Sequence, residues 1–253
     1  MNINNLLTFD SIDSTNTEAL KQARLGAEEG LCIVAGQQTA GRGRHGRTWV
    51  SEPDAGLYFS IVLRPKIESQ FLPLITLMTG VAVHDTLAEL GIAADIKWVN
   101  DLHVDGKKIS GILAETTDTP KGLAVIVGIG INIKSSNFPP EIADTATSIE
   151  ENVRAAPLSV QTAEAVTLTH ALTKFISYFY DILHSNDGPA TIIDEWRKRS
   201  TYFSGKPVRV VLENEALEGI TDGLEPNGAL RVKRNDGTLT IVQAGDVEQL
   251  RAT

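Results

Sequence analysis

The sequence predicts an α+β protein in which a large main domain is followed by a small C-terminal β domain. Apolar strand-like runs alternate with helical patterns as far as about residue 199. From Gly205 the pattern changes to short strands that turn sequences separate at intervals of about ten residues, which is typical of a small β-barrel. A chain of 253 residues suits one main domain with a small satellite. We therefore expect domains at residues 1–203 and 204–253.

Apolar spacing and turn residues place the individual elements. In the main domain we expect a helix that Gly26 ends and a hairpin at Asp105-Gly106. The other main-domain predictions are strands 31–35, 57–63 and 123–133, the amphipathic helix 72–90, a loop 135–148 that is either a lid or a disordered connector, and helices 159–183 and 190–199. The C-terminal strands are predicted at 208–212, 216–223, 229–233 and 239–243.

Composition excludes several classes of protein. A net charge of −9 argues against a broad surface for nucleic acid or membrane. Cys32 is the only cysteine, so no intrachain disulfide and no cysteine-based metal site can form. The N-terminus has no basic segment followed by an apolar one, and we expect no apolar stretch near the 18 or so residues that span a membrane. The chain is therefore expected to be cytoplasmic.

The stretch from Gly41 to Trp49 predicts a loop that wraps an anion. It combines three glycines, which let the backbone approach a ligand closely, with three arginines, whose guanidinium groups fit phosphate and carboxylate oxygens. The glycines also match the dinucleotide-binding pattern G-x-G-x-x-G. That pattern requires a helix to follow, but turn residues and the strand 57–63 come next. The dinucleotide-binding interpretation therefore fails.

Polar side chains gather in a second stretch, around the predicted hairpin. Lys97, Asn100, Asp101 and Lys108 lie within a dozen residues. Lys108 alternates with Ile109 and so faces away from the core, with Ser110 as a second candidate for that face. Gly128 and Gly130 weaken the strand 123–133, which indicates that a ligand or another backbone lies against it. Earlier in the chain, Ser14 and Asn16 suit either a helix N-cap or a binding site for an anion at a helix N-terminus, and the residues leave both readings open.

Taken together, these stretches resemble the biotin protein ligase family across nearly the whole chain. The matching motifs are Ser14-Thr15-Asn16, Gln38 to Trp49, Lys97 to Asp101, Lys107 to Leu113, and Gly128 to Asn132. The resemblance implies a mixed-sheet catalytic domain related to class II aminoacyl-tRNA synthetases, followed by an SH3-like β-barrel. Val99 departs from the family's usual proline. Some relatives begin with a winged-helix repressor domain, whereas this chain starts at the catalytic core, so DNA binding is not expected.

The resemblance also implies an activity and a set of site residues. Biotin and ATP would form biotinyl-5′-AMP, with Mg²⁺ on the ATP phosphates rather than in a fixed protein site, and biotin would then pass to a lysine of a biotin carboxyl carrier domain. Lys108, Arg44 and Asp101 would be catalytic, and the segment 146–148 would order over the adenylate. The expected biotin-binding residues are Ser14, Thr15, Asn16, Gln38, Arg42, Gly43, Arg44, Lys108, Gly111 and Gly128. The expected nucleotide-binding residues are Arg44, His45, Arg47, Trp49, Asn100 and Asn132.

Two other functions remain open on the sequence alone. A lipoate or octanoate ligase would share the fold and the reaction plan, although its resemblance through Gly41 to Trp49 is weaker. A non-enzymatic biotin sensor would use the same binding residues without turnover. The sequence does not fix the oligomeric state, and a homodimer is one option.

Overall fold

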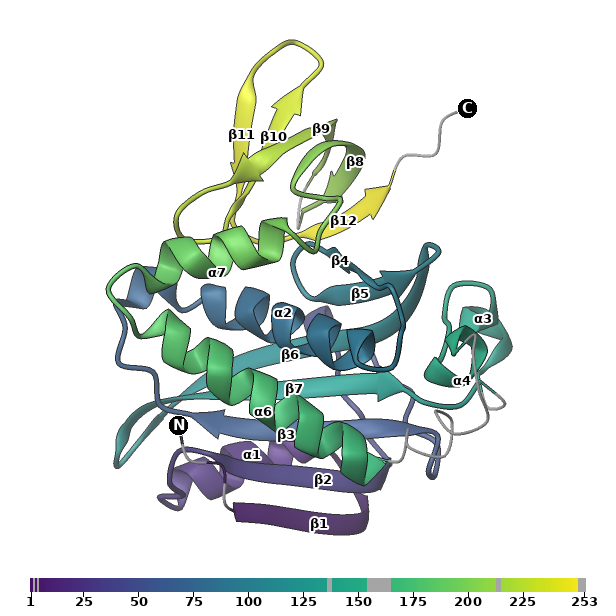
Figure 1. Ribbon diagram of the computed structural model, residues 1–253, viewed down its shortest axis with the longest axis vertical. Helices are drawn as coiled ribbons and strands as arrows, with labels where there is room; N and C mark the ends of the chain where they lie inside the picture. The colour runs from purple at the N-terminus through teal and green to yellow at the C-terminus, as the bar shows by residue number, and fades with distance from the viewer. Residues whose placement is uncertain (2, 4, 136–137, 154–164, 213–214, 250–253) are drawn as a thin grey trace.

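The fold is built on a seven-stranded mixed sheet. A computed structural model describes residues 1, 3, 5–135, 138–153, 165–212 and 215–249. The strand order is β1-β2-β3-β7-β6-β5-β4, in which only β1 and β2 pair in parallel (Figure 1). The predicted strand 123–133 is β7, and its central position is confirmed. The strands are β1 (Asn5–Ile12), β2 (Leu31–Gln38), β3 (Gly56–Leu63), β4 (Asp95–Lys97), β5 (Asp101–Val104), β6 (Lys107–Thr119) and β7 (Gly122–Asn132).

Helices cover both faces of this sheet. On one face, α1 (Thr15–Arg24) packs Ala19 and Ala23 against strand side chains such as Ile126. On the other face lie α2 (Leu74–Ala88) and α6 (Ala165–Leu183), with α7 (Gly188–Arg197) across their ends (Figure 1). The short helices α3 (Pro140–Ala143) and α4 (Ile149–Asn152) fall within and just after the predicted loop 135–148, so that segment is not a plain loop. The predicted start of α6 at residue 159 lies outside the described residues.

Helix α2 differs from its prediction in one respect. We expected an amphipathic helix, but eleven of its fifteen residues are buried, because α6 and α7 cover the side that faces away from the sheet. The helical segment 69–88 is also long and apolar enough to cross a membrane by length and composition, so the expectation that no stretch approaches this length is wrong. Because 61% of its apolar window is buried inside the protein, it is accounted for as a core helix.

The C-terminal residues form a separate antiparallel sheet with the order β11-β10-β9-β8-β12. Four of these strands were predicted, and β12 was missed because Val247 is its single buried apolar residue among those described. This sheet rests on the main one: the indole Nε1 of Trp98 donates to the carbonyl oxygen of Gly228 at 3.0 Å. The strands are β8 (Ser204–Val211), β9 (Ala216–Leu224), β10 (Leu230–Arg234), β11 (Leu239–Val242) and β12 (Asp246–Gln249).

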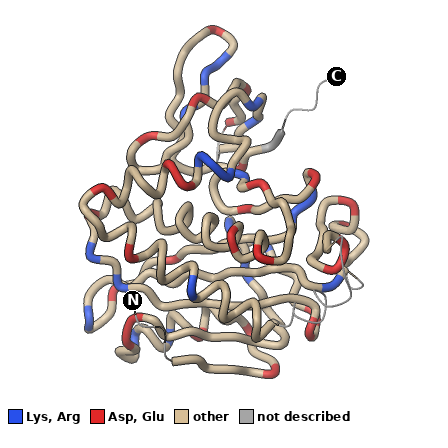
Figure 2. The backbone as a smooth tube through the Cα atoms, in the orientation of Figure 1, with Lys and Arg blue, Asp and Glu red and all other residues tan. Residues whose placement is uncertain are grey.

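Local backbone geometry agrees with the turn signals. Asp105 and Gly106 both have positive φ, 50° and 81°, as the predicted hairpin between β5 and β6 requires. The peptide bond between Trp98 and Val99 is cis. Acidic and basic residues are interspersed along the chain in the view of Figure 2 rather than separated onto two sides.

Candidate functional site

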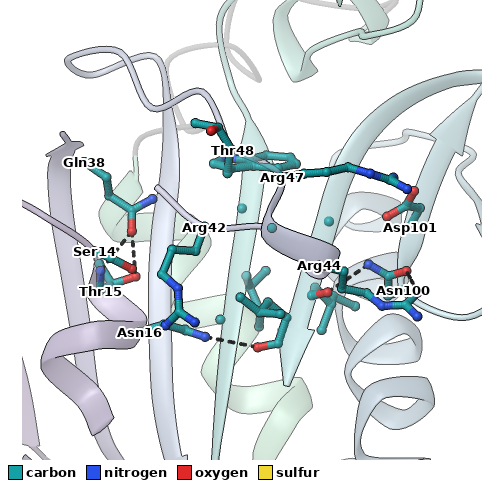
Figure 3. A pocket seen from close by; sticks show the side chains of 18 of the residues that line it. Ser14, Thr15, Asn16, Gln38, Arg42, Arg44, Arg47, Thr48, Asn100 and Asp101 are labelled. Atoms are coloured by element: carbon teal, nitrogen blue, oxygen red, sulfur yellow. Dashed lines mark hydrogen bonds between the residues drawn. The ribbon is translucent and has the colours of Figure 1, made fainter. Parts of the chain in front are cut away.

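A cavity lies where the Gly/Arg loop, defined as Gly41 to Trp49, crosses strands β6 and β7 (Figure 3). The fold brings every predicted biotin-binding residue to this cavity, together with Arg47, Trp49, Asn100 and Asp101. His45 and Asn132 do not line it. The lining residues that sequence reasoning did not name as site residues include Thr48, Phe59, Ile112, Leu113, Ile129, Gly130 and Asp246.

One end of the cavity is formed by the N-terminus of α1 and the end of β2. Ser14 occupies the N-cap position, but its side chain makes no capping hydrogen bond. Gln38 supplies that contact instead, because its Oε1 accepts from the backbone N–H of Thr15 at 2.9 Å and from the Thr15 hydroxyl at 3.1 Å. Its Nε2 donates to Ser51 Oγ at 2.8 Å. With the oxygen occupied twice, Gln38 has one N–H left to offer a ligand.

Asn16 offers a ligand a hydrogen-bond acceptor, whereas Gln38 offers a donor. Its Nδ2 donates to Glu115 Oε2 at 2.9 Å and to the Leu113 carbonyl at 3.3 Å, and its Oδ1 accepts from the Ser60 hydroxyl at 2.6 Å. Both amide hydrogens are therefore used, so Asn16 can only accept a further hydrogen bond. Gly128 leaves the space for this side chain, since a Cβ there would lie 2.1 Å from Asn16 Oδ1.

The Gly/Arg loop is held at both ends by ion pairs. Arg42 forms a two-pronged pair with Glu115 on β6, with Nη2 to Oε1 at 2.7 Å and Nη1 to Oε2 at 3.1 Å. At the other end, Arg47 pairs with Asp246, the first residue of β12. The C-terminal sheet therefore reaches the loop directly.

Arg44 lies between these two ends and points into the cavity. Its Nη1 donates to Asn100 Oδ1 at 2.9 Å and lies 3.9 Å from Asp246 Oδ1 (Figure 3). Burial lowers the pKa of its guanidinium from the usual value. His45, at φ 54°, is largely exposed on the short helical turn Arg44–Gly46.

Lys108 stands at the floor of the cavity beside Asp101. Its Nζ is 2.7 Å from Asp101 Oδ1 and 5.5 Å from the centre of the Trp49 ring. The strand pairing shifts here, because His103 faces Lys108 while Leu102 faces Ser110, which leaves Ile109 as a bulge. Owing to this bulge, Ser110 does not share the exposed face of Lys108. It is buried and donates to the carbonyl oxygen of Gly130 at 2.7 Å.

Trp49 separates this cavity from a second one. A Cβ on Gly130 would lie 2.3 Å from the Trp49 ring, and one on Gly111 would lie 2.9 Å from it, so both glycines open the slot that holds the indole. The sequence predicted a close approach at the 128–130 glycines, and the groups that approach are side chains rather than a backbone. Thr48, Trp49 and Lys108 line both cavities.

The second cavity lies under the segment 145–147. That segment pairs with the backbone of Lys108, whose N–H donates to the Thr145 carbonyl at 2.8 Å and whose carbonyl accepts from Thr147 N–H at 2.9 Å. Asn132 lines this cavity and donates to the Thr147 carbonyl at 3.0 Å. Its other lining residues include Val50, Glu52, Ala55, Tyr58, Lys134, Phe138, Ile142 and Ala146.

Two carboxylates at the site were missed by sequence reasoning. Glu115 follows Gly111 and Leu113 at the two-residue period of a strand, so the alternation of β6 could have placed it on the same face as these two lining residues. Asp246 comes from the other sheet, and no local pattern signals its position. Across the part of the chain that the structure describes, no group of three or more His, Cys, Asp or Glu side chains could hold a metal ion.

Comparisons with known proteins identify a family that this chain matches over nearly its whole length. Residues 8–132 match the model of the biotin/lipoate A/B protein ligase family, and residues 203–249 match the biotin protein ligase C-terminal domain. The chain is 35% identical to the bifunctional ligase/repressor BirA of Bacillus subtilis, over 96% of this chain and 73% of that protein. It is 32% identical to the biotin–[acetyl-CoA-carboxylase] ligase of Paracoccus denitrificans, over 93% and 96%. The biotin protein ligase of Aquifex aeolicus, solved with biotin and ATP, superposes with a TM-score of 0.82 at 28% identity, over 98% and 99%.

Proposed function

The chain belongs to the biotin protein ligase family and is an ATP-dependent biotin ligase, and we propose that Lys108 marks the point where its two substrates react. Lys108 is the charged residue that lines both cavities. A carboxylate in the first cavity and an α-phosphate entering from the second would both reach its ammonium group. This placement is the observation that carries the proposal.

The polarity of the first cavity supports biotin over lipoate. The biotin head group is a cyclic urea, with a carbonyl that accepts hydrogen bonds and two N–H groups that donate them. Gln38 has one N–H to offer, and Asn16 has only an acceptor to offer. The dithiolane ring of lipoate could use neither, so the remaining N–H of Gln38 and the remaining lone pair of Asn16 Oδ1 would lose water without gaining a partner, which costs binding energy.

Two steps complete the reaction. First, a carboxylate oxygen of biotin attacks the α-phosphorus of ATP, and the bond to pyrophosphate breaks, which gives biotinyl-5′-AMP. The lysine amine of the acceptor then attacks the carbonyl carbon, and AMP leaves. The first step brings two anions together, and the second develops negative charge on the carbonyl oxygen and on the departing AMP, so fixed cations are the main catalytic resource. We assign Lys108 to the carboxylate and the α-phosphate, Arg44 to the phosphates and to retention of the adenylate, and Asp101 to orienting the acceptor amine.

Other site residues are assigned to binding. Ser14, Thr15, Asn16 and Gln38 would hold the head group, while Trp49 and Asn132 would flank the nucleotide in the second cavity. Arg42 was expected to bind biotin and Arg47 the nucleotide, but each already has a carboxylate partner, so we assign them to positioning the loop. Mg²⁺ would arrive on the ATP phosphates, where it neutralises charge.

The acceptor would be a cytoplasmic biotin carboxyl carrier domain. The deciding experiment incubates the purified chain with biotin, ATP, Mg²⁺ and such a domain, and follows pyrophosphate release and the mass of the domain. We expect pyrophosphate and one added biotin. Transfer of lipoate instead would support the lipoate ligase alternative. Biotin binding without pyrophosphate release would identify a sensor.

A further inference from the structure

Glu115 is a carboxylate directly behind the wall of a cavity that must accept two anionic substrates, where it contacts two of the lining residues, Arg42 and Asn16. Its side chain is 23% exposed, and Arg42 neutralises it through the two-pronged ion pair. A carboxylate that only repelled substrate would be costly at this place, so its other contact is informative. Glu115 Oε2 also accepts from Asn16 Nδ2 at 2.9 Å.

This second contact fixes which end of the Asn16 amide faces which neighbour. An ionised carboxylate can only accept hydrogen bonds, so it holds the NH₂ end of Asn16 and excludes the flipped amide. Ser60 could not make this choice, because its hydroxyl can donate to an oxygen or accept from an NH₂ group. The Leu113 carbonyl contributes in the same sense as Glu115, but at the longer distance of 3.3 Å. Hydrogen bonds to charged groups are also the stronger ones.

We propose that Glu115 is a positioning residue for ligand specificity: it locks the Asn16 amide so that its oxygen is what a ligand meets, which selects a head group with an N–H there. Arg42 is the counter-ion that allows a carboxylate to lie next to the cavity. This inference rests on the proposed function, because it takes biotin as the ligand and assigns one of its ureido N–H groups to Asn16.

The test compares biotin with two isosteric cyclic carbamates in which oxygen replaces one or the other ureido N–H. Calorimetric titration gives the ratio of dissociation constants, analogue over biotin. The carbamate that places oxygen against Asn16 Oδ1 should bind the wild-type chain roughly tenfold to a hundredfold more weakly than biotin, because two acceptors would face each other. Glu115→Gln keeps the size of the side chain but can present either oxygen or NH₂, so the Asn16 amide can flip. In that variant the ratio should fall by about tenfold.

Arg42→Met is the matched control. It removes the ion pair but keeps the carboxylate that accepts from Asn16, so the absolute affinities will change while the ratio stays near the wild-type value. A ratio that responds equally in both variants would assign the effect to the ion pair and overturn the inference. A ratio that responds in neither would show that Glu115 does not orient Asn16, which also overturns it. If the wild-type chain fails to bind biotin, the proposed function itself fails, and the first titration shows this separately.

Discussion

Replacing Gly130 by alanine tests whether the Trp49 slot couples the two cavities. A Cβ on Gly130 would lie 2.3, 2.5 and 2.6 Å from three atoms of the Trp49 indole, all far inside van der Waals contact. Gly130 is on the central strand β7 and cannot move away, because it pairs with Tyr58 on one side and Gly111 on the other. The indole must therefore leave its slot.

Overpacking of this kind typically costs about 1–3 kcal/mol of folding free energy, and the short contacts place Gly130→Ala near the upper end. The cost should fall below about 1 kcal/mol in a Trp49→Ala background, since the three nearest atoms belong to that ring. Urea unfolding of the two single variants and the double variant gives this comparison.

The loss of activity should depend on displacement of the Trp49 ring rather than on the loss of folding free energy. Trp49 lines both cavities, so its displacement should weaken ATP binding and adenylate formation by tenfold or more, on the assumption that about 1.4 kcal/mol of contact is lost. Measurements are made at a temperature at which all variants are folded. Equal costs of Gly130→Ala in both backgrounds, or an unchanged affinity for ATP, would refute the idea that the glycine exists to seat the indole.

Three further predictions address charges at the site. Lys108→Gln should slow adenylate formation by roughly a hundredfold or more, as loss of one oxyanion-type donor does, whereas Arg44→Gly should mainly speed escape of biotinyl-AMP. Single-turnover assays that follow free and bound adenylate separate the two effects. Equal loss of adenylate formation in both variants, with no faster release from Arg44→Gly, would contradict the division of roles. Asp246→Asn should raise the KM for ATP severalfold, because the loop loses its tie to the C-terminal sheet and no longer holds Arg44 in place. The change in unfolding free energy should stay below about 1 kcal/mol, since pairs with an exposed partner contribute little. An unchanged KM would count against the link between the C-terminal sheet and the loop. Burial, followed by the charge of Lys97, lowers the pKa of His103 to about 4. Between about pH 6.5 and 4 the unfolded chain therefore binds a proton that the folded chain does not, and the free energy of unfolding should fall as the pH drops through this range. His103→Asn should flatten that part of the plot of unfolding free energy against pH, and a profile identical to that of the wild type would show that another group is responsible.

The elements that the sequence predicted well are those with a strong local cause. Asp105-Gly106 specifies its hairpin because both residues tolerate the positive φ that the turn needs. The strand 123–133 was placed centrally because nearly all of its residues are apolar, as a strand buried on both faces requires. By contrast, β1 (Asn5–Ile12) was missed because it is an edge strand with mostly exposed residues, and its pairing with β2 is the main reason it is a strand at all.

The membership of the site was easier to predict than its internal pairing. The motif residues converge on one cavity because β2, β6 and β7 lie within the same sheet and each carries its polar or glycine residues near the same place. Which charge pairs with which is decided by tertiary contacts. Arg42 and Arg44 are two residues apart in the sequence, yet one is neutralised by a carboxylate on β6 and the other donates to the amide oxygen of Asn100.

This difference between neighbouring arginines has a chemical consequence. A loop with three free guanidinium groups would bind any polyanion and would gain little from the reaction itself, because uniform binding of ground state and transition state does not raise kcat. Glu115 pairs with Arg42 and Asp246 pairs with Arg47, and these two ion pairs hold the loop backbone between them. Arg44, whose shortest partner is a neutral amide, keeps most of its charge available for the phosphates. The two carboxylates, which weaken the positive field of the loop overall, thereby concentrate what remains of it beside Lys108, where negative charge develops.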